Sequence, residues 1–307
     1  MKAVALEKYG SADDLRLVDL PAPKVAPGEV LVRVKAAGVN PVDWKLAAGY
    51  LDPIMEVRFP LVSGWDVAGV VEAVGLDAPE YQVGDEVFGY VRKDWAQNGA
   101  YAELVSAPVR TLARKPAALS WEQAAGVPLA GLTAYQSVQR AGVRAGETVL
   151  VHAASGGVGA FAVQILAALG ARVIGTASER NHDFLRDLGA EPVTYGEGLE
   201  ERVRALAPDG VDAALDFVGD GVVDLSLALL RGGPERLVSI ADQAAAEKGG
   251  HSLWVRPDAT DLAELAKLAD AGKLSVHVDR TFPLAEAADA WRLSGQGRTR
   301  GKIVLTV

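Results

Sequence analysis

The feature that most constrains the fold of this 307-residue chain is a glycine-rich turn between a buried strand and an apolar helix. It reads VLVHAASGGVGAFAVQ over residues 149–164. Small residues there let N–H groups at a helix N-terminus approach a pyrophosphate, and the last glycine lets the helix pack closely on the sheet. A turn without a ligand would use the same residues, but the strand before it and the helix after it favour an adenine dinucleotide. The candidate binding residues are Ala153, Ser155, Gly156, Gly157, Val158 and Gly159.

The end of the next strand bears on which dinucleotide would bind. An NAD-specific site places an acidic residue on the ribose about 20 residues beyond the turn, whereas this chain has Ser178 there. Ser178 and Arg180 could donate to a 2′-phosphate, although Glu179 between them would repel it if it pointed inward. The alternative is that Ser178 caps the following helix and Arg180 is solvated. The sequence favours NADPH.

Hydrophobic patterning predicts an α/β protein with two domains. From residue 147 onward buried strands alternate with helices, which is typical of a parallel sheet. The first hundred or so residues instead carry short β-rich runs separated by turn residues. A helix-start signal, Ser120-x-x-Gln123, marks the change between the two patterns. The last segment of the chain could belong to either domain on pattern alone.

Composition excludes several classes of function. The formal net charge of −9 disfavours nucleic acid and anionic membranes as partners. With no cysteine, the chain can form no disulfide, thiolate metal site or cysteine nucleophile, and its four histidines lack ligand spacing. For this reason we expect no metal. We see neither a signal peptide nor a clean apolar span of about 20 residues, and we therefore expect a soluble, cytoplasmic protein.

Six motifs in order carry a resemblance to a known family. They are AAGVNPVDWK (36–45), GWDVAGVVEAVG (64–75), VGDEVFGY (83–90), GLTAY (131–135), the AASGGVG turn and the closing GKIVLTV. In these motifs, over nearly its whole length, the chain resembles the zinc-independent quinone oxidoreductases of the medium-chain dehydrogenase/reductase superfamily, the group that includes zeta-crystallin.

The resemblance implies a fold and an activity. It implies a GroES-like β-rich substrate domain (residues 1–119, completed by 273–307) and a Rossmann domain with a doubly wound parallel sheet (120–272). The active site would lie in the cleft between them. The implied reaction is NADPH-dependent hydride transfer to quinones or to the double bond of α,β-unsaturated carbonyl compounds, commonly by a homodimer. The segment HSLWVRP (251–257) would then pair edge to edge between subunits, or be a strand buried within one subunit.

This sequence differs from the zinc-dependent branch of the superfamily at the positions of the zinc ligands. Where that branch carries a catalytic cysteine this chain has Asn40, and Trp65-Asp66 replaces its His-Glu pair. The four-cysteine structural lobe is absent too. A tetrahedral zinc site cannot be assembled from these residues, so we expect a zinc-free enzyme.

By resemblance, Asn40 and Asp43 lie near the nicotinamide, and Thr133 lies near its carboxamide or the substrate. Asn40-Pro41-x-Asp43 is equally a good helix start, with asparagine as N-cap and proline at the first helical position. Tyr50 is the nearby phenol that could donate a proton to an enolate, although an exposed or packing tyrosine is as good an interpretation. A quinone would need this donor less than an enone or an enoyl thioester.

The remaining cofactor candidates follow two later strands. Asp216 ends the run ALD and would face the cofactor at the carboxyl edge of a parallel sheet, unless it caps a turn. Val218 and Ala241 lie at the same edge. Two alternatives to quinone or enone reduction stay open: a non-catalytic NADPH-binding sensor and an enoyl-thioester reductase.

Overall fold

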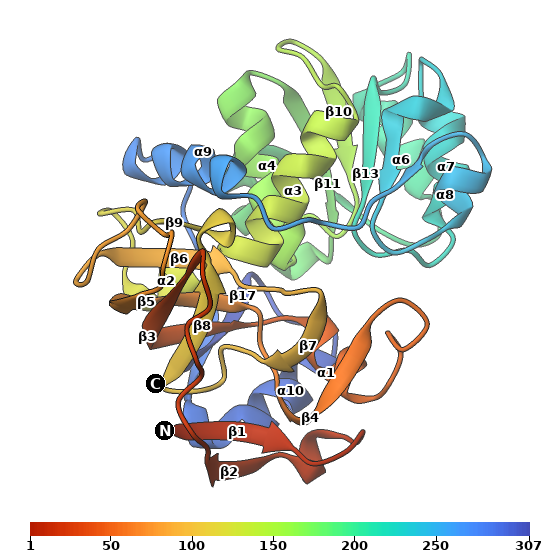
Figure 1. Ribbon diagram of the computed structural model, residues 1–307. Helices are drawn as coiled ribbons and strands as arrows, with labels where there is room; N and C mark the ends of the chain where they lie inside the picture. The colour runs from red at the N-terminus through yellow and green to blue at the C-terminus, as the bar shows by residue number, and fades with distance from the viewer. The chain divides into compact units, whose positions relative to one another are not determined.

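The computed structural model describes residues 1–307, which form two compact units (Figure 1). The first unit comprises Met1–Leu132 and Pro257–Val307, and the second comprises Thr133–Arg256. Helix α3 (Pro128–Arg140) contains the boundary between them. No helix combines the length and the apolar character that a membrane span requires.

The first unit is built on two β-sheets. The larger has the order β16-β17-β3-β5-β6-β9, with β8 also paired to β3, and the smaller has the order β2-β1-β4-β7. The strands of the larger sheet are β3 (Glu29–Val39), β5 (Asp66–Val74), β6 (Glu86–Tyr90), β8 (Leu104–Pro108), β9 (Leu112–Arg114), β16 (Val278–Pro283) and β17 (Lys302–Thr306). Those of the smaller are β1 (Lys2–Leu6), β2 (Arg16–Asp19), β4 (Glu56–Val62) and β7 (Trp95–Asn98).

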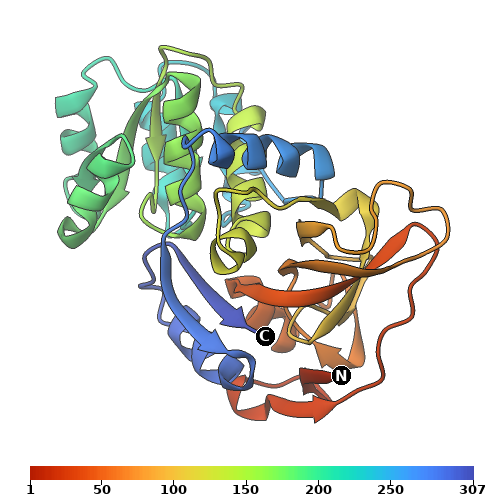
Figure 2. The ribbon, with the colours of Figure 1, turned by 90° about the vertical axis from the view of Figure 1, so that its left-hand side faces the viewer.

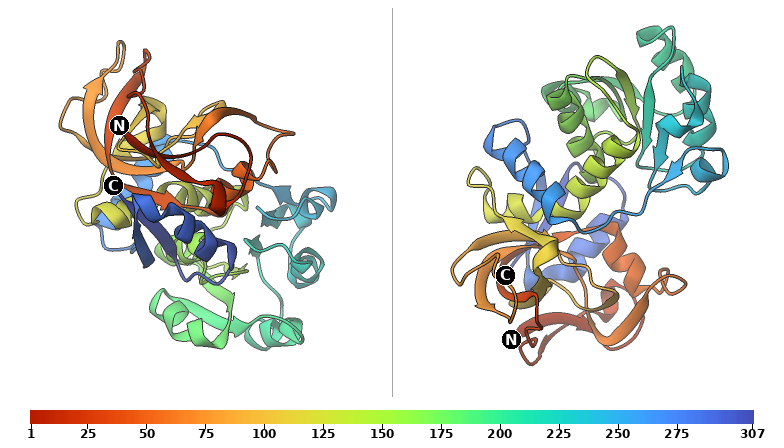
Figure 3. Two further views of the ribbon diagram at one scale, coloured as in Figure 1. Left: turned by 90° about the horizontal axis from the view of Figure 1, so that it is seen from below. Right: turned by 45° about the horizontal axis from the view of Figure 1, so that its top comes forward.

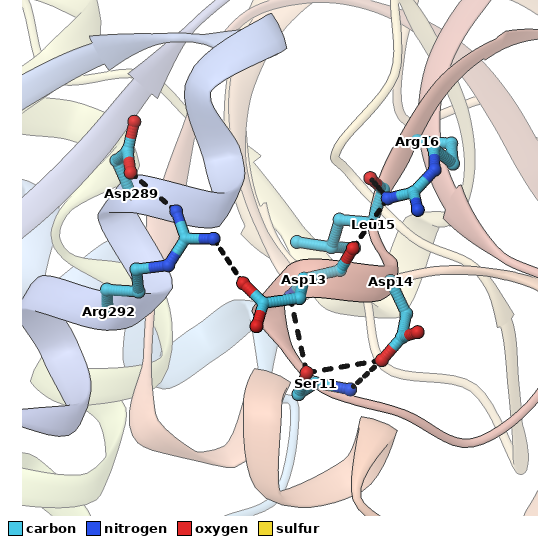
Figure 4. Close-up of polar contacts among 7 residues, drawn as sticks. All are labelled: Ser11, Asp13, Asp14, Leu15, Arg16, Asp289 and Arg292. Carbon is cyan, nitrogen blue, oxygen red and sulfur yellow. Dashed lines mark hydrogen bonds and ion pairs between the residues drawn. The ribbon is translucent and has the colours of Figure 1, made fainter.

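The C-terminal segment completes this unit. Strand β17 pairs antiparallel with β3, with Ile303 opposite Val39, and Figure 2 shows it beside the N-terminal strands. Helix α10 (Ala287–Gly295) contacts the 3₁₀ helix η1 (Ala12–Asp14). The guanidinium of Arg292 lies between the carboxylates of Asp13 and Asp289 (Figure 4). Its ion pair with Asp13 connects the C-terminal segment to the N-terminal segment.

The helices of the first unit explain where its boundaries fall. They are α1 (Pro41–Ala47), α2 (Trp121–Ala125), α9 (Ala259–Asp270) and α10, with η2 (Val109–Thr111) and η5 (Leu284–Glu286). The helix start predicted at Ser120 forms, because Ser120 Oγ accepts the Gln123 N–H at 3.2 Å. Helix α2 packs on β3 and β5 and α9 packs on β9. For this reason residues 120–132 and 257–272 lie with the β-rich unit, whereas the expected bounds place them in the Rossmann domain.

The second unit is a doubly wound, all-parallel sheet of order β12-β11-β10-β13-β14-β15 (Figure 3). Its strands are β10 (Thr148–Val151), β11 (Arg172–Ala177), β12 (Ala190–Thr194), β13 (Ala213–Asp216), β14 (Leu237–Ser239) and β15 (His251–Ser252). Its helices are α4 (Gly157–Leu169), α5 (His182–Asp187), α6 (Leu199–Leu206), α7 (Val222–Leu229) and α8 (Ala244–Glu247), with η3 (Glu179–Asn181) and η4 (Pro234–Arg236).

The strand order reverses between β10 and β13, and this point is where such sheets bind ligands at the carboxyl ends of their strands. A buried apolar core that includes Leu150, Ile174 and Val203 holds the sheet together. The predicted division into a β-rich unit and a doubly wound parallel sheet is therefore confirmed.

Candidate active site

The glycine-rich turn lies directly after β10, at the point where the strand order reverses. Ala153 adopts the left-handed conformation, with φ +52°, and its carbonyl accepts the Gly156 N–H at 3.0 Å. The turn is also bonded to the end of β11, because Thr176 Oγ1 accepts the Ala153 N–H at 3.0 Å and Thr176 O accepts the Ala154 N–H at 2.9 Å. These bonds hold the turn in one shape.

Helix α4 begins at this turn without a side-chain cap. Its N-cap residue is Gly156, which has no side chain to accept from the N–H groups of the first turn. At Gly159 a Cβ would lie 2.3 Å from the Ala153 carbonyl oxygen, so only glycine permits the helix to approach the turn so closely. Uncapped N–H groups and the positive end of a 13-residue helix fit a pyrophosphate.

Ser178 and Arg180 follow β11, which ends at Ala177. Ser178 precedes η3 but its hydroxyl forms no capping hydrogen bond, so the helix-cap alternative is not observed. Both Glu179 and Arg180 are exposed. Asn181 donates from Nδ2 to Ser155 Oγ at 3.0 Å and approaches Ser178 Oγ at 3.5 Å. Sequence reasoning missed Asn181, which connects the glycine-rich turn to the segment after β11.

Asp216 at the end of β13 is fully buried and supports the adjoining turn. Its Oδ1 accepts the N–H groups of Val218 at 2.9 Å and Gly219 at 2.8 Å, and its Oδ2 accepts the Ser239 hydroxyl at 2.7 Å. The turn-capping alternative is therefore what the structure contains. Val218 and Ala241 are exposed next to it, and a Cβ on Gly219 would lie 3.3 Å from the Cβ of Ala241.

His152 directly follows β10 and is buried as a neutral imidazole. Its Nε2 lies 2.9 Å from Ser226 Oγ on α7. Burial lowers the pKa of His152 to about 4, and the negative charge of Asp216 opposes this only in part. The histidine is therefore a core residue of the Rossmann unit that pairs with Ser226 in its neutral form.

In the β-rich unit, Asn40 and Asp43 lie at the start of α1 as the helix-start pattern predicts. Asn40 occupies the N-cap, Pro41 follows it, and Asp43 Oδ2 accepts the Asn40 N–H at 2.7 Å. The same oxygen accepts the hydroxyl of Tyr101 at 2.8 Å, and Tyr101 accepts from the indole of Trp291 at 3.3 Å. Asn40 is only 2% exposed and Asp43 only 1%, so both are core residues of this unit.

Asn40 also joins two charged groups from distant strands. Its Nδ2 donates to Asp66 Oδ2 at 2.9 Å, and its Oδ1 accepts from the ammonium of Lys302. Asp66 Oδ1 accepts the N–H of Leu129 in the first turn of α3 at 2.8 Å. We call Asn40, Asp43, Asp66, Tyr101 and Lys302 the buried polar cluster. Sequence reasoning quoted Asp66 and Lys302 within motifs but gave no reason to pair them.

Burial controls the titration of this cluster. Desolvation raises the pKa of Asp43 to about 7, although hydrogen bonds from Asn40 and Tyr101 oppose the change. Desolvation likewise raises the pKa of Asp66 to about 6, with the ammonium of Lys302 as the main opposing influence. The pKa of Lys302 is lowered by burial, and that of Tyr101 is raised well above its ordinary value.

Two further site candidates lie outside this cluster. Tyr50 follows α1 and is 70% exposed, and its phenol makes none of the polar contacts that join Asn40 and Asp43. Thr133 is buried in α3, where its carbonyl accepts the hydroxyl of Ser137 at 2.7 Å. The residues that occupy the zinc-ligand positions are engaged within the protein, since Asn40 bonds Asp66 and Trp65 packs against Tyr90. The structure contains no group of three or more His, Cys, Asp or Glu side chains suited to a metal ion.

Comparisons with known proteins agree with this architecture. Residues 26–117 match the family model described as alcohol dehydrogenase GroES-like domain, and residues 188–305 match the model described as zinc-binding dehydrogenase. The chain is 33% identical to the mouse mitochondrial protein named NAD(P)H oxidoreductase RTN4IP1, over 100% of this chain and 89% of the relative. It is 31% identical to a chloroplast envelope quinone oxidoreductase homologue from Arabidopsis thaliana, over 99% and 98% of the two chains.

Solved structures show the same likeness. The quinone oxidoreductase from Coxiella burnetii superimposes with a TM-score of 0.87 at 34% identity, over 100% of this chain and 99% of the other. A mycobacterial protein solved in complex with NADPH superimposes with a TM-score of 0.85 at 32% identity, over 100% of both chains.

A GroES-like unit together with a Rossmann unit whose first turn fits a pyrophosphate defines an NAD(P)H-dependent oxidoreductase. The chain belongs to the quinone oxidoreductase family of the medium-chain dehydrogenase/reductase superfamily, as its sequence motifs predict.

Proposed function

We propose that this protein is a zinc-free reductase that uses NADPH to reduce quinones or the double bond of α,β-unsaturated carbonyl compounds. The observation that carries the proposal is the uncapped first turn of α4 over the glycine-rich turn, in a chain of the quinone oxidoreductase family. The engaged residues at the zinc-ligand positions support the zinc-free part, because Asn40 already bonds Asp66 and Lys302.

Each binding residue has a distinct task in this proposal. When bound, NADPH supplies the hydride. The N–H groups at the start of α4 hold the pyrophosphate, and the exposed residues Val218 and Ala241 contact the nicotinamide half. Thr133 supports the site from within α3, where it is buried. Asn40 and Asp43 act by positioning, because both are buried and they fix the chain entering α1.

Proton supply depends on the acceptor. A hydroquinone can take its protons from water, whereas an enolate gains from a donor next to the reacting carbon. Tyr50 is our proposed donor for an enone, since its phenol is exposed and unconstrained by the core. Replacing Tyr50 by Phe would then lower kcat with an enone and leave quinone reduction unchanged.

NADPH preference rests on Ser178 and Arg180, because the residue that directly follows β11 is Ser178 and not an acidic residue. Loss of one charged partner of a phosphate costs about 1.5 to 3 kcal/mol, or roughly 10- to 150-fold in affinity. Arg180→Ala should therefore raise the Kd of NADPH by such a factor and leave that of NADH nearly unchanged. Equal losses for the two cofactors would refute the assignment.

We also propose that the protein is a homodimer paired through the edge of the parallel sheet. Strand β15 is one of the two edge strands of the sheet, and Trp254 just beyond it is 51% exposed. An unpaired edge beside a large apolar ring favours association with a second strand. Sedimentation equilibrium would show twice the chain mass, and a monomer at micromolar concentration would contradict the pairing.

The decisive experiment for the activity is oxidation of NADPH, followed at 340 nm, with a naphthoquinone, a phenanthrenequinone, an alkyl enone and an enoyl thioester. Parallel assays with NADH and metal analysis of the purified protein complete the test. Turnover of a quinone or the enone by metal-free protein is the expected result. Tight NADPH binding without turnover of any acceptor would instead indicate a non-catalytic sensor.

A further inference from the structure

An asparagine at the start of α5 bonds to the glycine-rich turn instead of capping its own helix. Asn181 occupies the N-cap position of α5, yet its side chain forms no capping hydrogen bond. Its Nδ2 donates to Ser155 Oγ at 3.0 Å and to Ser178 Oγ at 3.5 Å. An N-cap asparagine normally accepts with its side-chain oxygen from the first turn of the helix. Helix capping therefore does not explain where this amide lies.

Backbone hydrogen bonds hold the segments on both sides of this amide. The Asn181 N–H donates to the Ser178 carbonyl at 2.9 Å and closes the η3 turn. Thr176 at the end of β11 accepts from the N–H groups of Ala153 and Ala154 in the glycine-rich turn. Asn181 itself is only 8% exposed. The amide thus lies between two segments that are already bonded to the sheet.

The donor character of Nδ2 decides where the protons of the two serines point. A serine hydroxyl has one proton to donate and two lone pairs that accept, whereas the amide nitrogen of asparagine only donates. Because a lone pair of each Oγ faces Nδ2, the protons of Ser155 and Ser178 point elsewhere. Neither hydroxyl donates to another group of the protein, and both serines are partly exposed. Two hydroxyl donors are therefore available to a ligand.

An anion is the ligand that suits these donors. Ser155 directly precedes Gly156, the N-cap residue of α4, so its hydroxyl adds to the uncapped N–H groups of that helix. Ser178 precedes Arg180 by two residues. An aspartate in place of Asn181 would have the same shape, but it would accept both serine protons and add a negative charge. The amide at this position therefore favours phosphate, and a carboxylate would oppose it.

We infer that Asn181 is a positioning residue for the cofactor, which makes Ser155 a hydrogen-bond donor to the pyrophosphate of NADPH and Ser178 a donor to its 2′-phosphate. The inference rests on the proposed function and deepens it, because it adds to the NADPH preference a side chain that acts only through other side chains. Since one amide serves both serines, its loss weakens both contacts together.

The test measures cofactor binding, so it does not depend on turnover. The Kd values of NADPH and NADH would be measured by calorimetry, without an acceptor, for the wild type, Asn181→Ala and Asn181→Asp. Asn98→Asp is the control, since it makes the same change of charge at an exposed asparagine at the end of β7. Urea unfolding of each variant would establish that it is folded.

We expect Asn181→Ala to raise the Kd of NADH about threefold and that of NADPH about tenfold, since NADH loses only the contribution of Ser155 whereas NADPH loses that of both serines. Asn181→Asp should raise the Kd of NADPH about a hundredfold, because the carboxylate accepts the serine protons and repels the phosphates. Asn98→Asp should bind both cofactors as the wild type does.

A second background separates positioning from a general loss of structure. With Ser178 already replaced by Ala, Asn181→Ala should weaken NADPH and NADH by the same factor of about three, because the bond to Ser178 Oγ no longer exists. The inference is overturned if Asn181→Ala weakens the two cofactors equally when Ser178 is present. It is also overturned if Asn181→Asp binds NADPH as Asn98→Asp does.

Failure of the proposed function would give a different result. If the wild type reduces no acceptor but the Asn181 variants show the expected losses, the proposed reaction fails and the positioning role stands. If an acceptor is reduced with a preference for NADPH but these losses are missing, the reaction stands and the role of Asn181 is overturned. A wild type that binds NADH as tightly as NADPH would overturn the NADPH preference and the role of Asn181 together.

Discussion

Replacing Asp43 by Asn should change how the stability of the β-rich unit depends on pH. Both hydrogen bonds that Asp43 accepts, from Asn40 N–H and Tyr101 OH, end on Oδ2. An asparagine with its carbonyl oxygen in that place can keep them, so the substitution removes the charge and little else. The neutral amide avoids the cost of burying a carboxylate beside Asp66.

The direction and size of this change in stability with pH follow from the pKa of Asp43. It is about 7 in the folded protein against 3.8 for an unperturbed aspartate. Between these values the folded state binds the proton more tightly than the unfolded chain, so Asp43 makes the wild type less stable as pH rises from about 4 to 7. One pKa unit corresponds to about 1.4 kcal/mol, so the pH range from 5 to 7 accounts for about 2 to 3 kcal/mol.

The measurement is urea unfolding of wild type and Asp43→Asn at pH 5 and pH 8, followed by the fluorescence of the tryptophans, among them buried Trp291. The variant should gain about 2 to 3 kcal/mol relative to wild type on going from pH 5 to pH 8. Asp187→Asn, an exposed aspartate on α5, is the control and should show no such gain. If the free energies of unfolding of variant and wild type differ by the same amount at pH 5 and pH 8, the reasoning is refuted.

Two other substitutions test the Rossmann unit. Gly159→Ala would place a Cβ 2.3 Å from the Ala153 carbonyl oxygen. We therefore expect the affinity for NADPH, measured by calorimetry, to fall more than tenfold, and the free energy of unfolding, measured in urea, to fall by about 1 to 3 kcal/mol. Unchanged NADPH binding would contradict the role of this close approach. His152→Asn removes a buried histidine whose folded pKa of about 4 lies below its unfolded value near 6.5, so wild type loses stability as pH falls from about 6.5 to 4. The variant should lose less unfolding free energy over that pH range. If urea unfolding of the variant depends on acid pH as that of the wild type does, the assignment of a lowered pKa to His152 is contradicted.

Local features of this protein were predictable from sequence. The turn at residues 153–159 follows from backbone sterics over a few residues, and the start of α2 at Ser120 follows from one capping pair. The same is true of Asn40 and Pro41 at the start of α1. The family motifs extended these local predictions to the whole fold, because their order along the chain identifies two known domain types.

The tertiary structure alone decided which side chains meet. Lys302 reaches Asn40 because β17 pairs with β3 in the register that sets Ile303 opposite Val39, across more than 260 positions of sequence. Asp216 bonds a neighbouring strand through Ser239, and Tyr50 lies outside the polar contacts of Asn40 and Asp43 although it is near them in sequence. Sequence patterns reflect the backbone conformations that neighbouring residues prefer. Strand register and burial are instead properties of the assembled sheets. The motifs therefore determined the class of protein, and only the fold determined the charged partners that Asn40 and Asp43 acquire.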